Sequence, residues 1–299
     1  METSKLNSGT TVGVLYCGDM GTAFAKLLRK SGLRVVTTCQ GRSPVTKEQA
    51  LSSGIEILPS LEDVVAQSHF VFSLVLPSAA IDVARQYVCY RQMRPQDSIF
   101  VEANNIGLDA LKQIERLMAE QNIPLVDAAI HGTAHRLEDV AMLYISGPKA
   151  RSVEAICKGL LRVNWLGTRI GSASLMKQLM SAISKSLPGL FLEVGTLAER
   201  ADMLEPFLES CQRFYPSIMT VIERTLPTYP RHAVRRLAEV REIEELGRGF
   251  QLRLGMTHEA GTWIQLIASL PWHQMKSENP SDVRTIIHSV ANASFPENS

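Results

Sequence analysis

One stretch near the N-terminus constrains the fold of this chain more than any other. The letters VGVLYCGDMGTA, from Val12 to Ala23, read as a buried strand, a glycine turn and the first turn of a helix. Glycine lets the backbone approach a pyrophosphate, and a helix N-terminus holds its negative charge. A complete dinucleotide fingerprint has three glycines, and Tyr16 stands here at the first of those positions. The cofactor contacts predicted from the stretch are Gly18, Asp19, Met20 and Gly21.

Strand and helix signals alternate from this turn to about residue 165. Apolar or β-branched runs that end in turn residues occur at 33–38, 69–76, 98–102, 124–127, 141–146 and 163–166. Helical spacing of apolar residues follows several of them, as at 108–121. This order predicts an α/β fold with a doubly wound, largely parallel Rossmann sheet covered by helices on both faces. We assign it to residues 1–168.

The end of the second predicted strand indicates which dinucleotide binds. Sites for NAD carry an acidic residue about 20 positions past the glycines, where it binds the ribose hydroxyls. The run from Val35 to Lys47 contains no acid and has Arg42 and Ser43 at the turn instead. An arginine and a hydroxyl suit the 2′-phosphate of NADP, whereas a solvated loop arginine is the structural alternative. The missing acid favours NADP.

Two further strand ends are candidates for the nicotinamide side of the site. Pro77 follows the run at 69–76, and Asn104 follows the run at 98–102. Strand ends in such sheets face the ligand crevice, which would bring both residues close to the cofactor. Ordinary turn chemistry, which proline and asparagine also favour, is the alternative.

The second half of the chain, residues 169–299, predicts an all-helical domain. A long apolar helix spans 172–201, and Pro188 should kink it or split it in two. Further helices are expected at 204–213, 217–225, 231–249 and 257–270, with a polar linker at 277–282 before a short last helix. The long helix would join the two domains.

The long helix carries one polar stripe on an otherwise apolar surface. The stripe consists of Ser174, Lys177, Ser181, Ser184 and Lys185. A lysine on such a stripe faces either water or a cleft. In a closed cleft, desolvation lowers the pKa of Lys177 and lets it polarise a carbonyl or hydroxyl and relay a proton. A solvent-facing Lys177 is the alternative.

The helix expected at 231–249 carries many charged residues of both signs. A solvated or interface face explains such a pattern, and the functional alternative is that His232 or Arg235 holds a carboxylate or phosphate.

Composition narrows the class of protein. Hydrophobic residues make up 45% of the chain and the net charge is +1, which argues against nucleic-acid and membrane-surface partners. We find no transmembrane stretch, signal peptide or metal-ligand spacing. The five cysteines are scattered, which indicates reduced thiols and a cytoplasmic setting. Residues 1–10 and 294–299 are expected to be polar tails.

The motifs together resemble the β-hydroxyacid dehydrogenase and 6-phosphogluconate dehydrogenase superfamily over nearly the whole chain. The matches are Gly18-Asp19-Met20-Gly21 for the glycine fingerprint, Leu76-Pro77 for the strand-end dipeptide, Asp127-Ala128 for the substrate loop and Lys177 for the catalytic lysine. The segments LYISGP (143–148) and RHAVRR (231–236) are similar to a branch of uncharacterised oxidoreductases with a C-terminal domain of unknown function.

The resemblance implies roles for individual residues. Lys177 would be the acid/base, and Leu76, Pro77 and Asn104 would contact the cofactor. The substrate loop of the family would correspond to Asp127, His131 and Gly132, and from the patterns described above we add Ser181, Lys185 and His232 as substrate-binding residues. The chain departs from the family where His131-Gly132-Thr133 replaces Ser-Gly-Gly, and where Met180 and Ser181 replace the asparagines one turn past the lysine.

We therefore expect an NADP-dependent oxidoreductase that acts on a small hydroxyacid or ketone. An imine reductase is an alternative, because the exchanged asparagines fit a different substrate. A nucleotide-binding protein that lost its chemistry is the non-enzymatic alternative. The apolar helices of the second domain favour a homodimer.

Overall fold

The computed structural model describes residues 9–93, 97–272 and 282–293 of the chain. Its contacts divide the chain into two compact units, residues 1–177 and 178–299. The predicted tails at 1–8 and 294–299, and the linker at 277–281, lie outside the described residues. Within the described ranges, no helix is both long and apolar enough to cross a bilayer.

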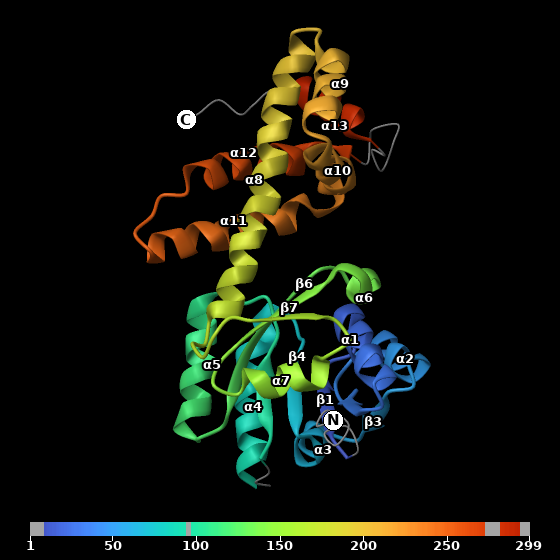
Figure 1. Ribbon diagram of the computed structural model, residues 1–299, viewed down its shortest axis with the longest axis vertical. Helices are drawn as coiled ribbons and strands as arrows, with labels where there is room; N and C mark the ends of the chain where they lie inside the picture. Colours follow the sequence, from blue (N-terminus) through green and yellow to red (C-terminus); the bar gives the residue numbers. More distant parts are fainter. Residues whose placement is uncertain (1–8, 94–96, 273–281, 294–299) are drawn as a thin grey trace. The chain divides into compact units, whose positions relative to one another are not determined.

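The first unit, drawn from blue to green in Figure 1, is built on one eight-stranded sheet. The strand order in this sheet is β3-β2-β1-β4-β5-β6-β7-β8. The strands are β1 (Thr11–Leu15), β2 (Arg34–Thr38), β3 (Glu56–Leu58), β4 (Phe70–Ser73), β5 (Ile99–Glu102), β6 (Leu125–His131), β7 (Met142–Ser146) and β8 (Arg162–Trp165). Only the β6–β7 pair is antiparallel among these neighbours. The first six strands follow the Rossmann order, which confirms the predicted doubly wound sheet.

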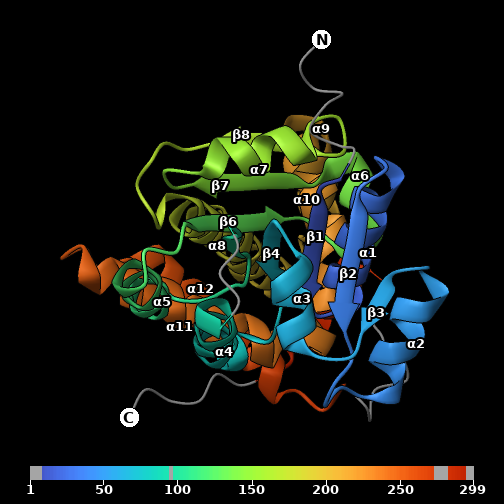
Figure 2. The same ribbon diagram turned by 90° about the horizontal axis from the view of Figure 1, so that it is seen from below.

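Helices cover both faces of the sheet, as the view in Figure 2 makes visible. They are α1 (Asp19–Lys30), α2 (Pro44–Ser52), α3 (Leu61–Gln67), α4 (Ala80–Met93), α5 (Leu108–Glu120), α6 (Leu137–Val140) and α7 (Ala150–Cys157). One core contains Phe24 of α1 and Ile156 of α7. The other contains Val64 of α3, Tyr87 of α4 and Ile114 of α5. Each sheet face is therefore buried, which explains the continuous apolar runs of the central strands.

Several elements of this unit were not predicted. Helices α2, α3 and α7 and strand β3 span nine residues or fewer, so each is too short to show a clear hydrophobic period. Strand β6 was expected to end at Asp127, but it continues to His131 by pairing with β7. That extension depends on a partner strand, so local sequence does not reveal it.

The second unit is helical, in agreement with the predicted all-α region. Its helices are α8 (Ser172–Arg200), which begins in the first unit, α9 (Leu204–Phe214), α10 (Pro216–Thr225), α11 (Tyr229–Gly249), α12 (Gly255–Ser269) and α13 (Val283–Ala291). Helix α8 is not split at Pro188. Gly189 follows the proline, and a Cβ there would lie 2.6 Å from the Cβ of Ala260, so α12 packs closely against α8.

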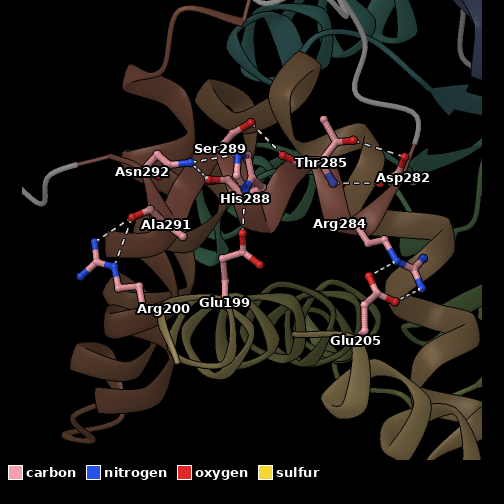
Figure 3. Close-up of polar contacts among 10 residues, drawn as sticks. All are labelled: Glu199, Arg200, Glu205, Asp282, Arg284, Thr285, His288, Ser289, Ala291 and Asn292. Carbon is pink, nitrogen blue, oxygen red and sulfur yellow. Dashed lines mark hydrogen bonds and ion pairs between the residues drawn. The ribbon is translucent and has the colours of Figure 1, made fainter. Parts of the chain in front are cut away.

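Helix α13 is tied to α8 and α9 by polar contacts at its surface (Figure 3). The Arg284 guanidinium binds both carboxylate oxygens of Glu205 at 2.7 and 2.9 Å. His288 Nδ1 lies 2.6 Å from Glu199 Oε1, and Arg200 donates twice to the Ala291 carbonyl. These contacts fix the last described helix to a core that includes Ile287 and Leu192.

Candidate active site

The glycine turn has the geometry that a pyrophosphate requires. Gly18 is the N-cap of α1, and a Cβ built on it would meet nothing within 4 Å. A Cβ on Gly21 would lie 2.0 Å from the Tyr16 carbonyl oxygen, so only glycine allows the first turn of α1 to lie against the end of β1. The first-turn amides of a helix have no partner inside it and attract an anion. The turn therefore fits a dinucleotide despite the missing first glycine.

Tyr16 does not project into this turn. Its side chain is only 8% exposed and belongs to the core that contains Val36 and Leu58. The guanidinium carbon of Arg42 lies 4.3 Å from the centre of the Tyr16 ring. Burial raises the pKa of the Tyr16 phenol, with Arg42 opposing the rise, so the ring is neutral at physiological pH. The two residues connect the end of β1 with the loop after β2.

Ser43 has a structural role next to Arg42. It is the N-cap of α2, and its hydroxyl oxygen accepts a hydrogen bond from the Thr46 amide at 3.3 Å. The Arg42 amide donates to the Cys39 carbonyl at 3.0 Å. The loop is thus fixed by capping, and a phosphate contact from Ser43 would be additional to that role.

Four polar side chains form a row across the sheet at the carboxyl ends of β4 and β5. The strand register places Ser73, Glu102, Asp127 and Ser146 on neighbouring strands, in that order. All four are buried. Because buried polar groups need partners, this row determines how the adjacent loops are held.

Asn104 is buried and serves the loop after β4. Its side-chain oxygen accepts from the Val75 amide at 2.5 Å, and its side-chain nitrogen donates to Ser73 Oγ at 2.8 Å. These two bonds fix the loop after β4 to the end of β5, and the contact of Asn104 with the nicotinamide stays a prediction. Leu76 is 74% exposed, and Pro77 begins a short 3-10 helix beyond it.

Glu102 is a buried acid that sequence reasoning passed over. Its side chain is 1% exposed, Oε1 accepts from the Asn104 amide at 3.0 Å, and Oε2 has no partner among the described residues. Burial raises the pKa of Glu102 to about 7, and the charge of Asp127 adds to the rise. The sequence feature that could have indicated this residue is an acid at the end of the apolar strand 99–102.

Asp127 caps the helix that carries Lys177. Its Oδ2 accepts from the amides of Gly171, Ala173 and Ser174 at 2.9 to 3.1 Å, and its Oδ1 accepts from the Ser174 hydroxyl at 2.6 Å. The Ser146 hydroxyl also donates to Oδ2. With 0% exposure and these five donors, Asp127 anchors the N-terminus of α8, and its contact with a substrate stays a prediction.

Anchoring the first turn of α8 places Lys177 one turn beyond Ser174. Asp127 and Ser146 both belong to the row at the edge of the sheet, so the base of this turn is fixed to that edge. The carboxyl ends of β1, β4 and β5 meet at the same edge because the strands are parallel. Lys177 is therefore on the side of the sheet where the glycine turn lies.

His131 and Gly132 end strand β6. His131 is half-buried and pairs with Met142 in the β6–β7 ladder. Gly132 has φ +148, and a Cβ there would lie 2.9 Å from the Ala141 Cβ. The positive φ and the close approach of Ala141 therefore explain why position 132 is glycine. Any substrate contact of Gly132 would be made through its backbone amide.

Ser181 and Lys185 lie together in the second unit. The Lys185 ammonium forms a 2.5 Å ion pair with Glu239 of α11 and donates to Ser181 Oγ at 2.6 Å. His232 is also on α11, about two turns before Glu239. Its pKa is lowered by partial burial and by the charges of Arg235, Arg236 and Arg231. His232 therefore lies close to three arginines, whereas the charge of Lys185 beside Ser181 is paired with Glu239.

A parallel sheet in this strand order, with a glycine turn and a helix N-terminus at its switch point, defines a dinucleotide-binding Rossmann protein. A sequence model of the NAD binding domain of 6-phosphogluconate dehydrogenase matches residues 11–163. The chain belongs to this family, which confirms the resemblance inferred from its motifs. A domain of unknown function, DUF1932, matches residues 198–267, as the branch with an uncharacterised C-terminal domain implied.

Known proteins extend the likeness to both units. An uncharacterised 28.5 kDa protein of Methanothermus fervidus is 28% identical over 78% of this chain and 89% of its own length. The conserved protein MTH1747, of unknown function and described as structurally similar to 3-hydroxyacid dehydrogenases, is also 28% identical, with a TM-score of 0.73 over 86% of this chain and 96% of that one.

Two enzymes of known activity share the fold at low identity. Mycobacterium tuberculosis 3-hydroxyisobutyrate dehydrogenase with L-serine is 14% identical, with a TM-score of 0.74 over 94% of this chain and 99% of that one. The reductive aminase of Aspergillus terreus, in complex with NADPH and ethyl levulinate, is 15% identical, with a TM-score of 0.56 over 93% of this chain and 98% of that one.

Proposed function

We propose that this protein is an NADP-dependent oxidoreductase that acts on a small hydroxyacid or ketone, with Lys177 as its acid/base. The observation that carries the proposal is the Asp127 cap, which fixes the turn before Lys177 to the edge of the sheet where the glycine turn begins. A cofactor turn and a lysine on one edge are what hydride transfer coupled to proton transfer needs.

The cofactor would be held by main chain at one end and by a cation at the other. The amides of Asp19, Met20 and Gly21 would bind the pyrophosphate. Arg42 would bind the 2′-phosphate through the edge of its guanidinium, with Ser43 beside it. Among the described residues, Arg42 has no carboxylate partner, which supports a role for its charge in ligand binding. Asn104 would hold the Val75–Pro77 loop for the nicotinamide side.

The residues of this chain would supply binding, orientation and proton transfer. The nicotinamide, when bound, supplies or accepts the hydride. The Lys177 ammonium would polarise the substrate oxygen and donate its proton during reduction, or its neutral amine would accept the hydroxyl proton during oxidation. His131, Gly132, Ser181, Lys185 and His232 would bind and shape the substrate.

An imine reductase is the second candidate. The chain has Met180 and Ser181 where the hydroxyacid dehydrogenases carry asparagines, and the reductive aminase shares the fold. In that case Lys177 would act on nitrogen instead of oxygen. A protein that binds the nucleotide without chemistry is the third candidate.

Steady-state assays test the proposal. The purified protein is incubated with NADPH and a panel of 3-ketoacids and cyclic imines, and with NADP and 3-hydroxyacids. Turnover of the acids supports the proposal, and turnover of the imines alone supports the second candidate. Binding of NADPH without any turnover supports the non-enzymatic candidate.

We also propose a homodimer formed by the helical units. Leu190, Val194 and Leu197 of α8 are exposed at helical spacing. Leu190 and Val194 also line a groove of about 250 Å³, together with other largely apolar side chains such as Phe191 and Phe207. Exposed apolar surface of this kind is typical of protein interfaces. Light scattering should give twice the monomer mass, and a stable monomer at micromolar concentration would contradict the proposal.

A further inference from the structure

Tyr16, which replaces the first glycine of the fingerprint, lies under Arg42, which we assign to the 2′-phosphate. Tyr16 ends up buried in the core beside α3 and α4, and the Arg42 guanidinium lies over its ring at 4.3 Å. We propose that Tyr16 is a specificity-determining positioning residue, whose ring holds Arg42 in the orientation that binds the 2′-phosphate of NADP. The inference rests on the proposed NADP preference.

The geometry leaves the phosphate-binding atoms of Arg42 available. A guanidinium that stacks on an aromatic ring interacts through its face, and its N–H donors then point outward in the guanidinium plane. Arg42 is exposed, and none of the described carboxylates pairs with it. The ring can therefore fix the guanidinium without competing for the donors that a phosphate needs.

Both partners are held by rigid surroundings. Tyr16 directly follows β1 and its amide donates to the Leu74 carbonyl at 3.3 Å. Arg42 lies in a loop closed by its own amide and by the Ser43 cap of α2. Fixing a flexible arginine before the ligand arrives lowers the entropic cost of binding.

The surrounding charge also suits an anion. Lys47 of α2 lies near enough to Cys39 to oppose the rise that burial causes in the pKa of its thiol. Cys39 is the residue whose carbonyl accepts from the Arg42 amide. Two cations thus border the end of β2, and no acid occurs between Val35 and Lys47.

Affinities for NADPH and NADH in a small set of variants test the inference. Tyr16→Leu removes the aromatic face but keeps an apolar side chain. It should weaken NADPH binding about 3- to 20-fold while NADH binding stays within about twofold. Tyr16→Phe keeps the face and should retain the NADPH preference. Arg151→Ala is the matched control, because it removes another cation–π pair, with Trp165 at 4.0 Å, from the far strand of the sheet.

A double-mutant cycle separates positioning from folding. In the Arg42→Ala background, Tyr16→Leu should cause no further loss of NADPH affinity, because its effect acts through the guanidinium. Equal losses for NADPH and NADH in Tyr16→Leu, or an additive loss in the double variant, would overturn the inference.

The same variants distinguish this inference from the proposed function. If Arg42→Ala leaves the NADPH preference intact, the proposed cofactor assignment fails, and the inference fails with it. If Arg42→Ala abolishes the preference but Tyr16→Leu behaves like Tyr16→Phe, only the inference about Tyr16 fails.

Discussion

The carboxylate of Asp127 accepts a 2.6 Å hydrogen bond from the hydroxyl of Ser174, across 47 residues of sequence. The contact joins strand β6 to the first turn of α8, and three amides of the same segment donate to the other carboxylate oxygen. It fixes the start of the helix that carries Lys177. The catalytic proposal therefore depends on how this buried carboxylate holds the start of α8.

Replacing Asp127 should destabilise the first unit. Asp127→Ala leaves buried amide donors without an acceptor, and we expect a loss of about 2–4 kcal/mol in the free energy of unfolding. Asp127→Asn should not rescue it, because an amide nitrogen would face N–H donors. Ser174→Ala is the milder control, with an expected loss of about 1 kcal/mol. Urea denaturation followed by circular dichroism measures the difference, and an unchanged Asp127→Ala would refute the capping role.

Glu102 should make stability depend on pH. Its folded pKa of about 7 lies above the value of 4.5 for the unconstrained acid, so the folded state retains a proton that the unfolded state releases between these pH values. Its stabilising contribution is therefore complete below pH 4.5 and is lost as the pH rises to about 7, by up to about 3 kcal/mol.

The pH effect is measured against Glu102→Gln, which keeps the shape of the side chain without a titratable proton. Urea midpoints are compared at pH 5 and pH 8. The wild type should lose more stability over this interval than the variant does. Parallel losses would show that Glu102 already ionises near its ordinary pKa.

Lys177→Met should reduce turnover at least about 100-fold on whichever substrate the assays identify. NADPH affinity should stay near the wild-type value, because the pyrophosphate turn belongs to α1. Lys112→Met, on the exposed surface of α5, is a control for loss of a lysine. Unchanged turnover in the Lys177→Met variant would show that Lys177 is not the acid/base.

Arg42→Ala should weaken NADPH binding much more than NADH binding, because only NADPH carries the 2′-phosphate. A loss of about 10- to 100-fold for NADPH is expected from removal of a charge-assisted phosphate contact. Raising the salt concentration should reduce the NADPH affinity of the wild type more than that of the variant. Fluorescence titration measures both effects, and equal loss for the two cofactors would refute the phosphate role.

Glu239→Gln should destabilise the second unit by about 1–3 kcal/mol, because it leaves the Lys185 ammonium largely buried without its carboxylate. Glu239 also helps raise the pKa of Glu242, after burial as the main cause. The Glu242 carboxyl should therefore titrate at lower pH in the variant. Thermal unfolding and carboxyl NMR check the two outcomes, and no change in either would contradict the ion pair.

Local patterns in the sequence were sufficient for the fold class. The run from Val12 to Ala23 predicted β1, the turn and α1, because each depends on neighbouring residues and on the steric freedom of glycine. Alternating strands and helices predicted the sheet. The short elements α2, β3 and α7 were missed because their stability comes from packing, which local propensity does not contain.

The amino-acid order by itself determined a Rossmann sheet, its glycine turn, the absence of an acid after β2 and a helical second half. The tertiary structure alone decided that Asp127 caps α8, that Asn104 holds the loop after β4, that Glu102 is buried beside Asp127, and that Tyr16 lies under Arg42. Strand register and helix docking bring these partners together from distant positions in the chain. Hydrogen bonding, burial and charge at such contacts depend on distances in space, and these cannot be read from the separation of residues along the sequence.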